Sequence, residues 1–277
     1  MIVTRFAPSP TGLLHLGHAF AAIKAHEAGD RFLLRIEDLD TARCRDEFAD
    51  AVFADLRWLG IRWQEPVIRQ SERGPAYGDA LRKLDALELT YPCFCTRKEI
   101  AVEIARAAGA PSGPDGPIYP STCRNLSQTE RDARRGQPYA LRLNATKAAQ
   151  QVGALTFHEH GQGPNGETGT IRVRPQLFGD IVLARKDLPA SYHLAVVVDD
   201  AHQGVTLVTR GEDLFAATHV HRLLQALLGF REPGYAHHRL ILDASGKKFS
   251  KRDRSITLRA LRENGWTPAQ IRSTLQL

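Results

Sequence analysis

The first forty residues alternate between apolar runs and short polar breaks, in an order that predicts a strand, a loop, a helix and a second strand. Residues 2–6 (IVTRF) are rich in strand-forming types, and the Pro/Gly segment APSPTG ends this run. Residues 17–29 place apolar side chains on one helical face between two glycines, and residues 31–38 (RFLLRIED) form an apolar run that ends in acids. This order predicts a βαβ unit of a parallel sheet, in which ligands bind at the carboxyl ends of the strands.

The pattern changes in the middle of the chain. Helical spacing covers about 46–59 and 74–89, but seven of the twelve residues from Gly109 to Pro120 are Gly or Pro, which excludes regular structure there. From about 138 to 185 the pattern is that of β-strands. We therefore expect an inserted, mixed α/β subdomain over 90–185.

The second half returns to the first pattern. The segment YHLAVVVDDAHQGVTLVTRGEDL predicts apolar strands with acidic ends, and a helix, a further strand and a helical tail follow. The sequence predicts an α/β fold in which two halves of one parallel-sheet domain flank the insertion, followed by a basic loop with a short helical end. The expected divisions are 1–89, 90–185, 186–240 and 241–277.

The composition is that of a globular protein with a basic bias. The chain has 277 residues, 43% hydrophobic and 25% charged, with a formal net charge of +6. No apolar run approaches the ~20 residues that span a membrane, and the start (MIVTRFAPSP) lacks the apolar core of a signal peptide. We expect a cytoplasmic protein. The positive charge favours a polyanionic partner such as nucleic acid, with an ordinary solvated surface as the alternative.

Two histidines flank Leu16 and Gly17 where the first helix is expected to begin. Three-residue spacing places the rings of His15 and His18 on one side of the first turn. A helix N-terminus after a Pro/Gly loop binds anions, and imidazole N–H groups there can donate to phosphate oxygens. Taken by itself, the pair is equally compatible with helix capping or metal ligation.

A basic loop, LDASGKKFSKRD, occupies residues 242–253. It carries Lys248 and Lys251 on either side of Phe249 and Ser250. A mobile lysine loop can neutralise a triphosphate in a transition state. A solvated basic loop is the alternative.

Together these motifs resemble those of the class I aminoacyl-tRNA synthetases. HLGH and KFSKR resemble the HIGH and KMSKS signatures of that class, with Phe249 at the second position of KMSKS. RFAPSPTGLLHLGH, RIEDLD, YHLAVVVDDAHQGVTLVTRGEDL and RLILDASGKKFSKRD are similar to its glutamate branch, from residue 4 to 253 with a gap across the insertion. The resemblance implies a Rossmann-type domain that activates glutamate with ATP and Mg²⁺, giving glutamyl-adenylate and pyrophosphate.

The resemblance also implies roles for individual residues. His15, His18 and Lys248 would hold ATP, while Lys251 would stabilise the departing pyrophosphate. Guanidinium groups suit the two carboxylates of glutamate, and Glu37 would take its α-ammonium. The implied glutamate site consists of Arg5, Phe6, Ala7, Pro8, Ser9, Glu37, Tyr192 and Arg210. Further candidates for contact with the ribose or with Mg²⁺ are the strand-end acids Asp38, Asp40, Glu212 and Asp213.

Three of the four cysteines cluster in the middle of the chain. In a strand, the side chains of Cys93 and Cys95 point the same way, and Cys123 supplies a third sulfur. A structural zinc takes four ligands, for which Asp115 and Tyr119 are both candidates; buried free thiols are the alternative. The resemblance implies structural Zn²⁺ on Cys93, Cys95, Tyr119 and Cys123, through the pattern C-x-C followed by Y-x-x-x-C. The fourth cysteine, Cys44, is expected to be a free thiol.

Residues 254–277 alone follow the basic loop, whereas helical anticodon-binding domains follow the core in the glutamate branch. We therefore expect no anticodon-binding domain and a truncated paralogue. Such an enzyme activates glutamate without tRNA and transfers it to queuosine in the anticodon of tRNA(Asp). The alternatives are a glutamyl-tRNA synthetase-like enzyme acting at the acceptor end, a stand-alone adenylate-forming enzyme, and a zinc-containing RNA-binding module.

The expected partners are L-glutamate and tRNA(Asp) carrying queuosine, bound by a monomer. Basic side chains in the second half of the insertion are candidates for contact with the RNA backbone, with a solvated face as the alternative. They are Arg124, Arg131, Arg134, Arg135, Arg172 and Arg174.

Overall fold

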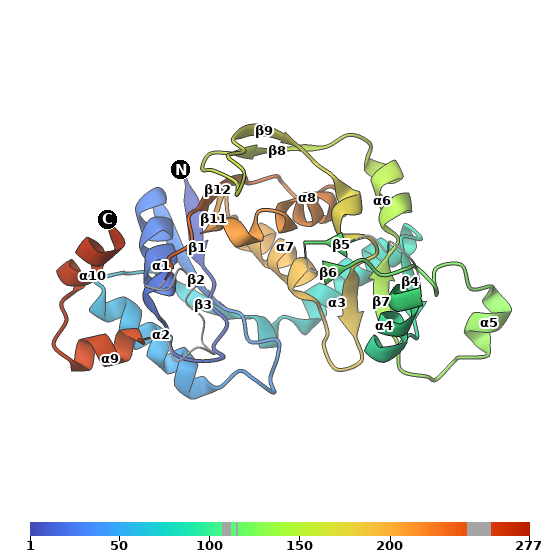
Figure 1. The fold of residues 1–277 in the computed structure, drawn as a ribbon, viewed down its shortest axis with the longest axis horizontal. Coiled ribbons are helices and arrows are strands. Elements are labelled where there is room, and N and C mark those ends of the chain that lie inside the picture. The colour runs from blue at the N-terminus through green and yellow to red at the C-terminus, as the bar shows by residue number, and fades with distance from the viewer. Residues whose placement is uncertain (107–111, 115, 243–255) are drawn as a thin grey trace.

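The computed structural model describes residues 1–106, 112–114, 116–242 and 256–277 (Figure 1). Lys248 and Lys251 of the basic loop, and the candidate ligand Asp115, lie outside the described residues. None of the helices in the described part of the chain combines the length and apolar character that crossing a membrane requires.

Two groups of parallel strands meet at the centre of the molecule. In the first group, β2 lies between β1 and β3, and both pairings are parallel. In the second group, β12 lies between β11 and β8, again in parallel, and β9 pairs with β8 in the antiparallel sense. The groups meet where Thr206 N–H donates to the Val3 carbonyl at 3.0 Å. The strands are β1 (Val3–Phe6), β2 (Arg31–Ile36), β3 (Gln64–Arg69), β8 (Thr156–Glu159), β9 (Gly169–Arg172), β11 (Leu207–Gly211) and β12 (Gly234–His238).

This arrangement confirms the predicted parallel sheet. Strand order runs outward from β1 through β2 to β3 on one side, and from β11 through β12 to β8 on the other. The order reverses between β1 and β11, and a ligand crevice forms at the carboxyl ends of such strands. Arg5, on β1, and Arg210, on β11, both lie at this junction.

Helices lie against the parallel strands (Figure 1). They are α1 (Leu16–Ala28), α2 (Asp46–Trp58), α3 (Gly74–Ala86), α7 (Tyr192–His202), α8 (Ala217–Leu228), α9 (Leu258–Glu263) and α10 (Pro268–Leu275), with short 3₁₀ turns at Gln70–Glu72, Pro175–Phe178 and Glu212–Leu214. The predicted helices at 46–59 and 74–89 are confirmed as α2 and α3. The helical tail is also confirmed: α9 and α10 share an apolar core with α1 and α2, to which Leu258 and Ile271 contribute.

The prediction of a strand over the apolar run YHLAVVVDD is wrong, because Tyr192–His202 forms helix α7. Ser191 caps the helix by accepting a hydrogen bond from Leu194 N–H. Residues 194–200 are all buried, and the helix packs against α3 and α8. A helix buried on every side has no polar stripe, so its sequence resembles a buried strand.

The middle of the chain adds a separate antiparallel sheet with the order β10-β7-β4. Its strands are β4 (Thr90–Cys93), β7 (Ala140–Leu143) and β10 (Val182–Arg185), accompanied by α4 (Arg97–Arg106), α5 (Gln128–Asp132), α6 (Ala145–Val152) and a small hairpin of β5 (Ser112–Gly113) and β6 (Gly116–Pro117). Strands β8 and β9 also fall within 90–185, yet they extend the sheet of β11 and β12. The domain limits drawn from the sequence therefore remain a prediction.

Candidate functional site

The two histidines of HLGH cap the first turn of α1. His15 Nδ1 accepts a hydrogen bond from Gly17 N–H at 3.1 Å, and His18 Nδ1 accepts from His15 N–H at 3.2 Å. Because both Nδ1 atoms are acceptors, a neutral ring carries its proton on Nε2. Each ring thus presents an N–H donor at a helix N-terminus, where anions are stabilised. Capping and phosphate binding are compatible roles for this pair.

The segment that begins at Thr257 lies against the HLGH turn. Thr257 forms an isolated β-bridge with His15, and Leu258 N–H donates to the Leu14 carbonyl at 2.8 Å. Residues 257 and 258 therefore lie against the HLGH turn.

Arg5 is buried on β1 and held from two sides. Its Nε and Nη2 donate to the carboxylate oxygens of Asp200, at 2.9 and 3.2 Å, and its Nη1 donates to the Thr209 carbonyl at 3.2 Å. These contacts use one N–H on each nitrogen, which leaves a second N–H on Nη1 and on Nη2. Two such donors can bind a carboxylate with parallel hydrogen bonds.

Asp200 is shared with a second buried arginine. Arg35 Nη1 lies 2.7 Å from Asp200 Oδ1, and Arg35 Nη2 lies 3.1 Å from Glu37 Oε1. Burial by itself would raise the pKa of Asp200, but Arg5 and Arg35 outweigh it and the pKa is lowered. Burial raises the pKa of Glu37, and Arg35 offsets this only in part. Glu37 is thus a desolvated carboxylate that a further cation, such as an ammonium group, would stabilise.

A cavity of about 840 Å³ lies at this end of the sheet, with Ser9, Glu37 and Tyr192 in its wall. Tyr192 is the first residue of α7. The pKa of Tyr192 is raised, chiefly by burial; the charge of Glu37 adds to this effect, and the charges of Arg210 and Arg5 oppose it. The phenol therefore lies within electrostatic reach of Glu37 and of both arginines. The structure brings together the polar side chains predicted for an amino-acid pocket.

Arg210 occupies the corresponding position on β11, but its partners are neutral. It donates from Nε to His237 Nε2 at 3.0 Å and from Nη2 to Thr218 Oγ1 at 2.6 Å, and its Nη1 lies 3.0 Å from His221 Nδ1. Its side chain is only 6% exposed. Among the described residues, Asp200 thus neutralises Arg5, whereas no carboxylate pairs directly with Arg210.

The three cysteines of the middle region converge on one tyrosine. The sulfur atoms of Cys93, Cys95 and Cys123 lie within 4.8 Å of one another. The Tyr119 hydroxyl lies 3.3 Å from Cys93 Sγ and 3.6 Å from Cys95 Sγ. Tetrahedral zinc with Zn–S bonds of about 2.3 Å separates its ligand atoms by about 3.8 Å. The donor set therefore fits a four-coordinate zinc ion.

The surroundings of Tyr119 also suit a metal-bound phenol oxygen. The hydroxyl accepts a hydrogen bond from Cys123 N–H at 2.9 Å, and the Arg142 guanidinium lies 3.8 Å from the centre of the ring. Both contacts favour negative charge on the oxygen, whereas burial and the hydrogen bond with Cys93 raise the pKa of the metal-free phenol. Cys44 lies apart from this cluster, with its sulfur 3.9 Å from the Glu37 carbonyl oxygen.

Comparison with known families accounts for this geometry. The model for the catalytic domain of class I tRNA synthetases (E and Q) matches residues 1–277. The chain belongs to this family. As in the resemblance noted from the motifs, it is a ligase of the aminoacyl-tRNA synthetase type.

The synthetase is similar to several curated relatives. It is 50% identical to the glutamyl-Q tRNA(Asp) synthetase of Rhodobacter capsulatus, over 100% of both chains. It is 42% identical to the protein of that name from Nocardia farcinica, covering 98% of this chain and 82% of the relative. Glutamate--tRNA ligase 2 of Alkalilimnicola ehrlichii is 37% identical, but this chain spans only 57% of it.

Solved structures confirm the class I synthetase fold. The crystal structure of a glutamate tRNA ligase from Elizabethkingia meningosepticum in complex with its amino acid matches with a TM-score of 0.74 at 28% identity. The match covers 96% of this chain and 53% of the ligase, so the chain spans about half the length of that protein. Mycobacterium tuberculosis methionyl-tRNA synthetase, at 15% identity and a TM-score of 0.57, shares the fold.

Not every predicted residue of the synthetase site points into the cavity. The Phe6 side chain packs in the core beside α1, and the Pro8 carbonyl accepts a hydrogen bond from Glu37 N–H at 3.0 Å. Asp38 binds Arg69 at 3.0 Å, so its carboxylate already has a structural role. Asp40 pairs with Arg43, and Glu212 accepts a hydrogen bond from Leu240 N–H.

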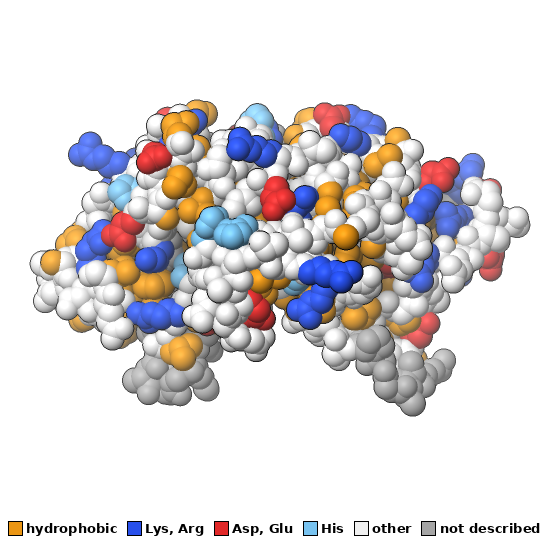
Figure 2. Space-filling model, turned by 90° about the horizontal axis from the view of Figure 1, so that it is seen from above, with side chains coloured by type: hydrophobic (Ala, Val, Ile, Leu, Met, Phe, Trp, Pro, Cys, Tyr) orange, Lys and Arg blue, Asp and Glu red, His pale blue; other side chains and the backbone are white. Residues whose placement is uncertain are grey.

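The predicted RNA-contact arginines do not form one face. On the face seen in Figure 2, Lys and Arg side chains lie in small groups, with Asp and Glu side chains among them. Arg124 pairs with Asp180 at 3.3 Å, and Arg172 ends β9 in the other sheet. Arg174 directly precedes the 3₁₀ turn Pro175–Phe178. Arg131, Arg134 and Arg135 line one cavity of about 440 Å³.

Sequence reasoning missed the residues that hold the two pocket arginines in place. Arg35 and Asp200 carried a weak signal, because each is a charge next to apolar residues, in LLRIED and AVVVDD. Charges rarely occur in fully buried strands or helices unless they are paired. Nothing in the sequence marked His221 or His237, since histidine is common in structural positions.

Proposed function

We propose that this synthetase activates glutamate with ATP in the absence of tRNA and transfers it to queuosine in the anticodon of tRNA(Asp). The observation that carries the proposal is the 50% identity, over the whole of both chains, to a glutamyl-Q tRNA(Asp) synthetase. The relatives named glutamate--tRNA ligase are less similar and extend well beyond the region they share with this chain. Activity at the acceptor end of tRNA(Glu) is the main alternative.

In the first step, a carboxylate oxygen of glutamate attacks the α-phosphorus of ATP and pyrophosphate leaves. Arg5 and Arg210 bind carboxylates of the amino acid, and Glu37 binds its ammonium group. The short Arg5–Ser9 segment and Tyr192 complete the pocket. A bound ammonium would supply the cation that the buried Glu37 carboxylate lacks.

The phosphates of ATP, with Mg²⁺, bind at the start of α1. The Nε2–H groups of His15 and His18 donate to phosphate oxygens there. Lys248 and Lys251 neutralise the charge that develops on the leaving pyrophosphate. In the second step, a hydroxyl of the queuosine ring attacks the acyl carbon of the adenylate and AMP leaves.

Cys93, Cys95, Tyr119 and Cys123 would hold a structural Zn²⁺. When bound, the ion would cross-link β4 to the loop around Tyr119, next to the main cavity, whose wall includes Cys95. Zinc in the purified protein should be close to stoichiometric and should be lost on the double change Cys93→Ser with Cys123→Ser. Zinc content that survives this change would contradict the assignment.

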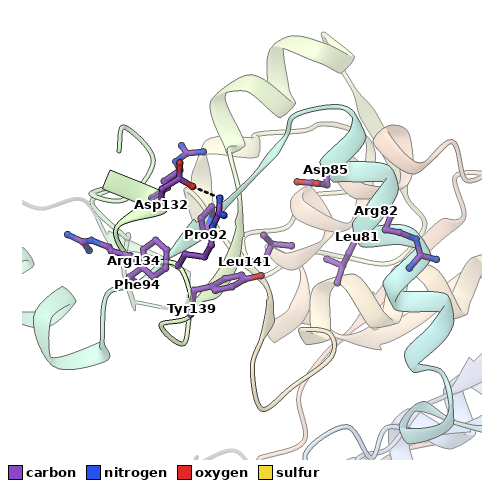
Figure 3. A pocket seen from close by; sticks show the side chains of 12 residues that line it. Leu81, Arg82, Asp85, Pro92, Phe94, Asp132, Arg134, Tyr139 and Leu141 are labelled. Atoms are coloured by element: carbon purple, nitrogen blue, oxygen red, sulfur yellow. Dashed lines mark hydrogen bonds and ion pairs between the residues drawn. The ribbon is translucent and has the colours of Figure 1, made fainter. Parts of the chain in front are cut away.

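The arginine-lined cavity between α3 and α5 is the proposed contact for the RNA backbone (Figure 3). The Arg134 guanidinium lies over the Phe94 ring at 5.6 Å, and Tyr139 is 51% exposed. Guanidinium groups beside exposed aromatic rings bind phosphates and stacked bases. Replacing Arg131 and Arg134 by Ala should raise the KM for tRNA(Asp) and leave glutamate activation unchanged.

The decisive experiment compares acceptors. Glutamate-dependent exchange of pyrophosphate into ATP should proceed without tRNA. Labelled glutamate should then appear on tRNA(Asp) that contains queuosine and on neither tRNA(Asp) without it nor tRNA(Glu). Acceptor-end charging of tRNA(Glu) would refute the proposal. The monomeric state, the domain limits and the cytoplasmic location remain predictions from the sequence.

A further inference from the structure

Arg210 lies at the centre of a chain of buried hydrogen bonds that the proposed mechanism leaves unexplained. On one side its Nε donates to His237 Nε2, and His237 Nδ1 lies 2.6 Å from Glu159 Oε2. On the other side, its Nη1 lies 3.0 Å from His221 Nδ1, and His221 Nε2 lies 3.1 Å from His193 Nδ1. The network thus links β8, β11, β12, α7 and α8 around one guanidinium.

The arginine fixes the protonation of both histidines beside it. Arginine has donors and no acceptor, so His237 Nε2 and His221 Nδ1 must both be unprotonated acceptors. His237 then carries its proton on Nδ1, where it donates to Glu159, and His221 carries its proton on Nε2, where it donates to His193. Both imidazoles are therefore neutral.

The environment agrees with neutral rings. Burial lowers the pKa of His221 well below its usual value, and the Arg210 charge lowers it further. Burial also lowers the pKa of His237, and the hydrogen bond to Glu159 reverses only part of that effect. The side chains of His237 and Glu159 are both 0% exposed.

Arg210 is consequently a buried charge without a direct counter-ion. Within the ranges that the structure describes, no carboxylate lies within 4.0 Å of its guanidinium nitrogens, and Glu159 reaches it only through the His237 ring. Arg5, by contrast, is bound by both oxygens of Asp200. Burying an unpaired charge is costly, and a substrate carboxylate would remove that cost.

The three contacts of Arg210 also leave donors for such a ligand. Nε, Nη1 and Nη2 each use one N–H, so Nη1 and Nη2 each retain a second. A carboxylate can accept from both. A carboxamide offers its oxygen to one of these donors, places its NH₂ group against the other, and supplies no negative charge.

We propose that His221 and the Glu159–His237 pair are positioning residues that present Arg210 as a guanidinium without an anionic partner, so that the pocket selects a side-chain carboxylate over its amide. This inference rests on the proposed activation of glutamate. It adds that glutamine is rejected because the protein leaves one charge for the substrate to neutralise. A carboxylate introduced into the network would then replace that of the substrate.

The test uses two nearly isosteric changes at one position, His221→Gln and His221→Glu. Gln keeps a neutral acceptor for Arg210 Nη1, whereas Glu adds an anion there. In amino-acid-dependent pyrophosphate exchange, His221→Glu should raise the KM for glutamate about a hundredfold, as expected when a close charge pair is redirected. The preference for glutamate over glutamine should fall by a similar factor, while the KM for ATP stays unchanged. His221→Gln should remain within a few-fold of the unchanged chain in each quantity.

Two controls separate positioning from folding and from added charge. His202→Glu adds the same charge at an exposed position on α7 and should leave the KM for glutamate unchanged. Thermal unfolding with and without glutamate reports folding and binding independently of catalysis. Loss of glutamate-induced stabilisation in His221→Glu, with retention in His221→Gln, is the expected pattern even where catalysis is slow.

The outcomes distinguish this inference from the function on which it rests. Equal KM values for glutamate in His221→Gln and His221→Glu would overturn the positioning role. So would an equal loss for glutamate and glutamine, because Arg210 would then bind a group that both amino acids share. Absence of glutamate-dependent exchange in the unchanged chain would overturn the proposed function itself.

Discussion

Among the buried side chains of the site, Asp200 is the one whose replacement we expect to lower the free energy of unfolding most. Its carboxylate accepts hydrogen bonds from Arg5 at 2.9 and 3.2 Å and from Arg35 at 2.7 Å, and it is only 9% exposed. Asp200→Asn keeps the shape but removes the charge. Arg5 then loses its carboxylate partner among the described residues, and Arg35 keeps its hydrogen bonds to Glu37 and to the Gln203 side-chain oxygen.

The expected cost follows from burial. Removing one partner of a buried ion pair costs about 3–5 kcal/mol, because the remaining charge stays desolvated. Asn still offers one oxygen as an acceptor, so the lower part of that range, about 3 kcal/mol, is expected. For a chain of this size, 1 kcal/mol corresponds to about 2–4 °C. The midpoint of thermal unfolding should therefore fall by about 10 °C.

The stability that Asp200 contributes should depend on pH in one direction. The folded-state pKa of Asp200 is depressed, so its contribution is complete above the unfolded-state pKa and is lost as pH falls through the folded-state value. The difference between Asp200→Asn and the unchanged chain should be constant near neutral pH and should narrow in acid.

Asp46→Asn is the matched control. Asp46 also pairs with an arginine, Arg69, at 2.6 Å, but its side chain is 85% exposed. Exposed ion pairs contribute about 0–1 kcal/mol, so this change should hardly alter the midpoint. Unfolding followed by circular dichroism measures both variants. A loss below about 1 kcal/mol for Asp200→Asn, or equal losses for the two variants, would refute the reasoning.

Three further predictions concern single positions. Burial raises the pKa of Asp55 to about 6, so ionisation of this group destabilises the folded protein by about 3 kcal/mol as pH rises from about 4 to 6. Asp55→Asn should remove that pH dependence in unfolding measured across this range. A Cβ atom on Gly161 would lie 2.2 Å from the His237 carbonyl oxygen, so Gly161→Ala should destabilise the protein by about 2 kcal/mol or more in thermal unfolding. Gly74→Ala is the control: a Cβ atom there would have no neighbour within 4 Å, and this change should not destabilise the protein. Burial raises the pKa of Glu37, so the KM for glutamate in pyrophosphate exchange should rise as pH falls through that pKa, and a KM independent of pH would contradict the ammonium-binding role.

Much of the site was predictable because its chemistry is carried by short local motifs. HLGH and the Pro/Gly loop before it lie within one turn and one strand end, so their spacing alone placed two imidazoles at a helix N-terminus. The two-residue spacing predicted that Cys93 and Cys95 act together; their sulfurs do lie close, although β4 ends at Cys93 and Cys95 follows the strand. Arg5 and Arg210 were identified through motif resemblance, and the parallel strands that carry them were visible as apolar runs.

The sequence by itself determined the class of fold and the types of residue at the carboxyl ends of its strands. The tertiary structure alone decided which of those charges are neutralised. Asp200 lies 195 residues from Arg5, and Glu159 lies 78 residues from His237, and no local pattern records a contact across such a separation. The helical state of α7 was decided in the same way, because an apolar run buried on all sides takes the form that its neighbours α3 and α8 accommodate. Burial is a property of the assembled fold, and the assembled fold pairs Arg5 with Asp200 while it surrounds Arg210, among the described residues, with His237, His221 and Thr218.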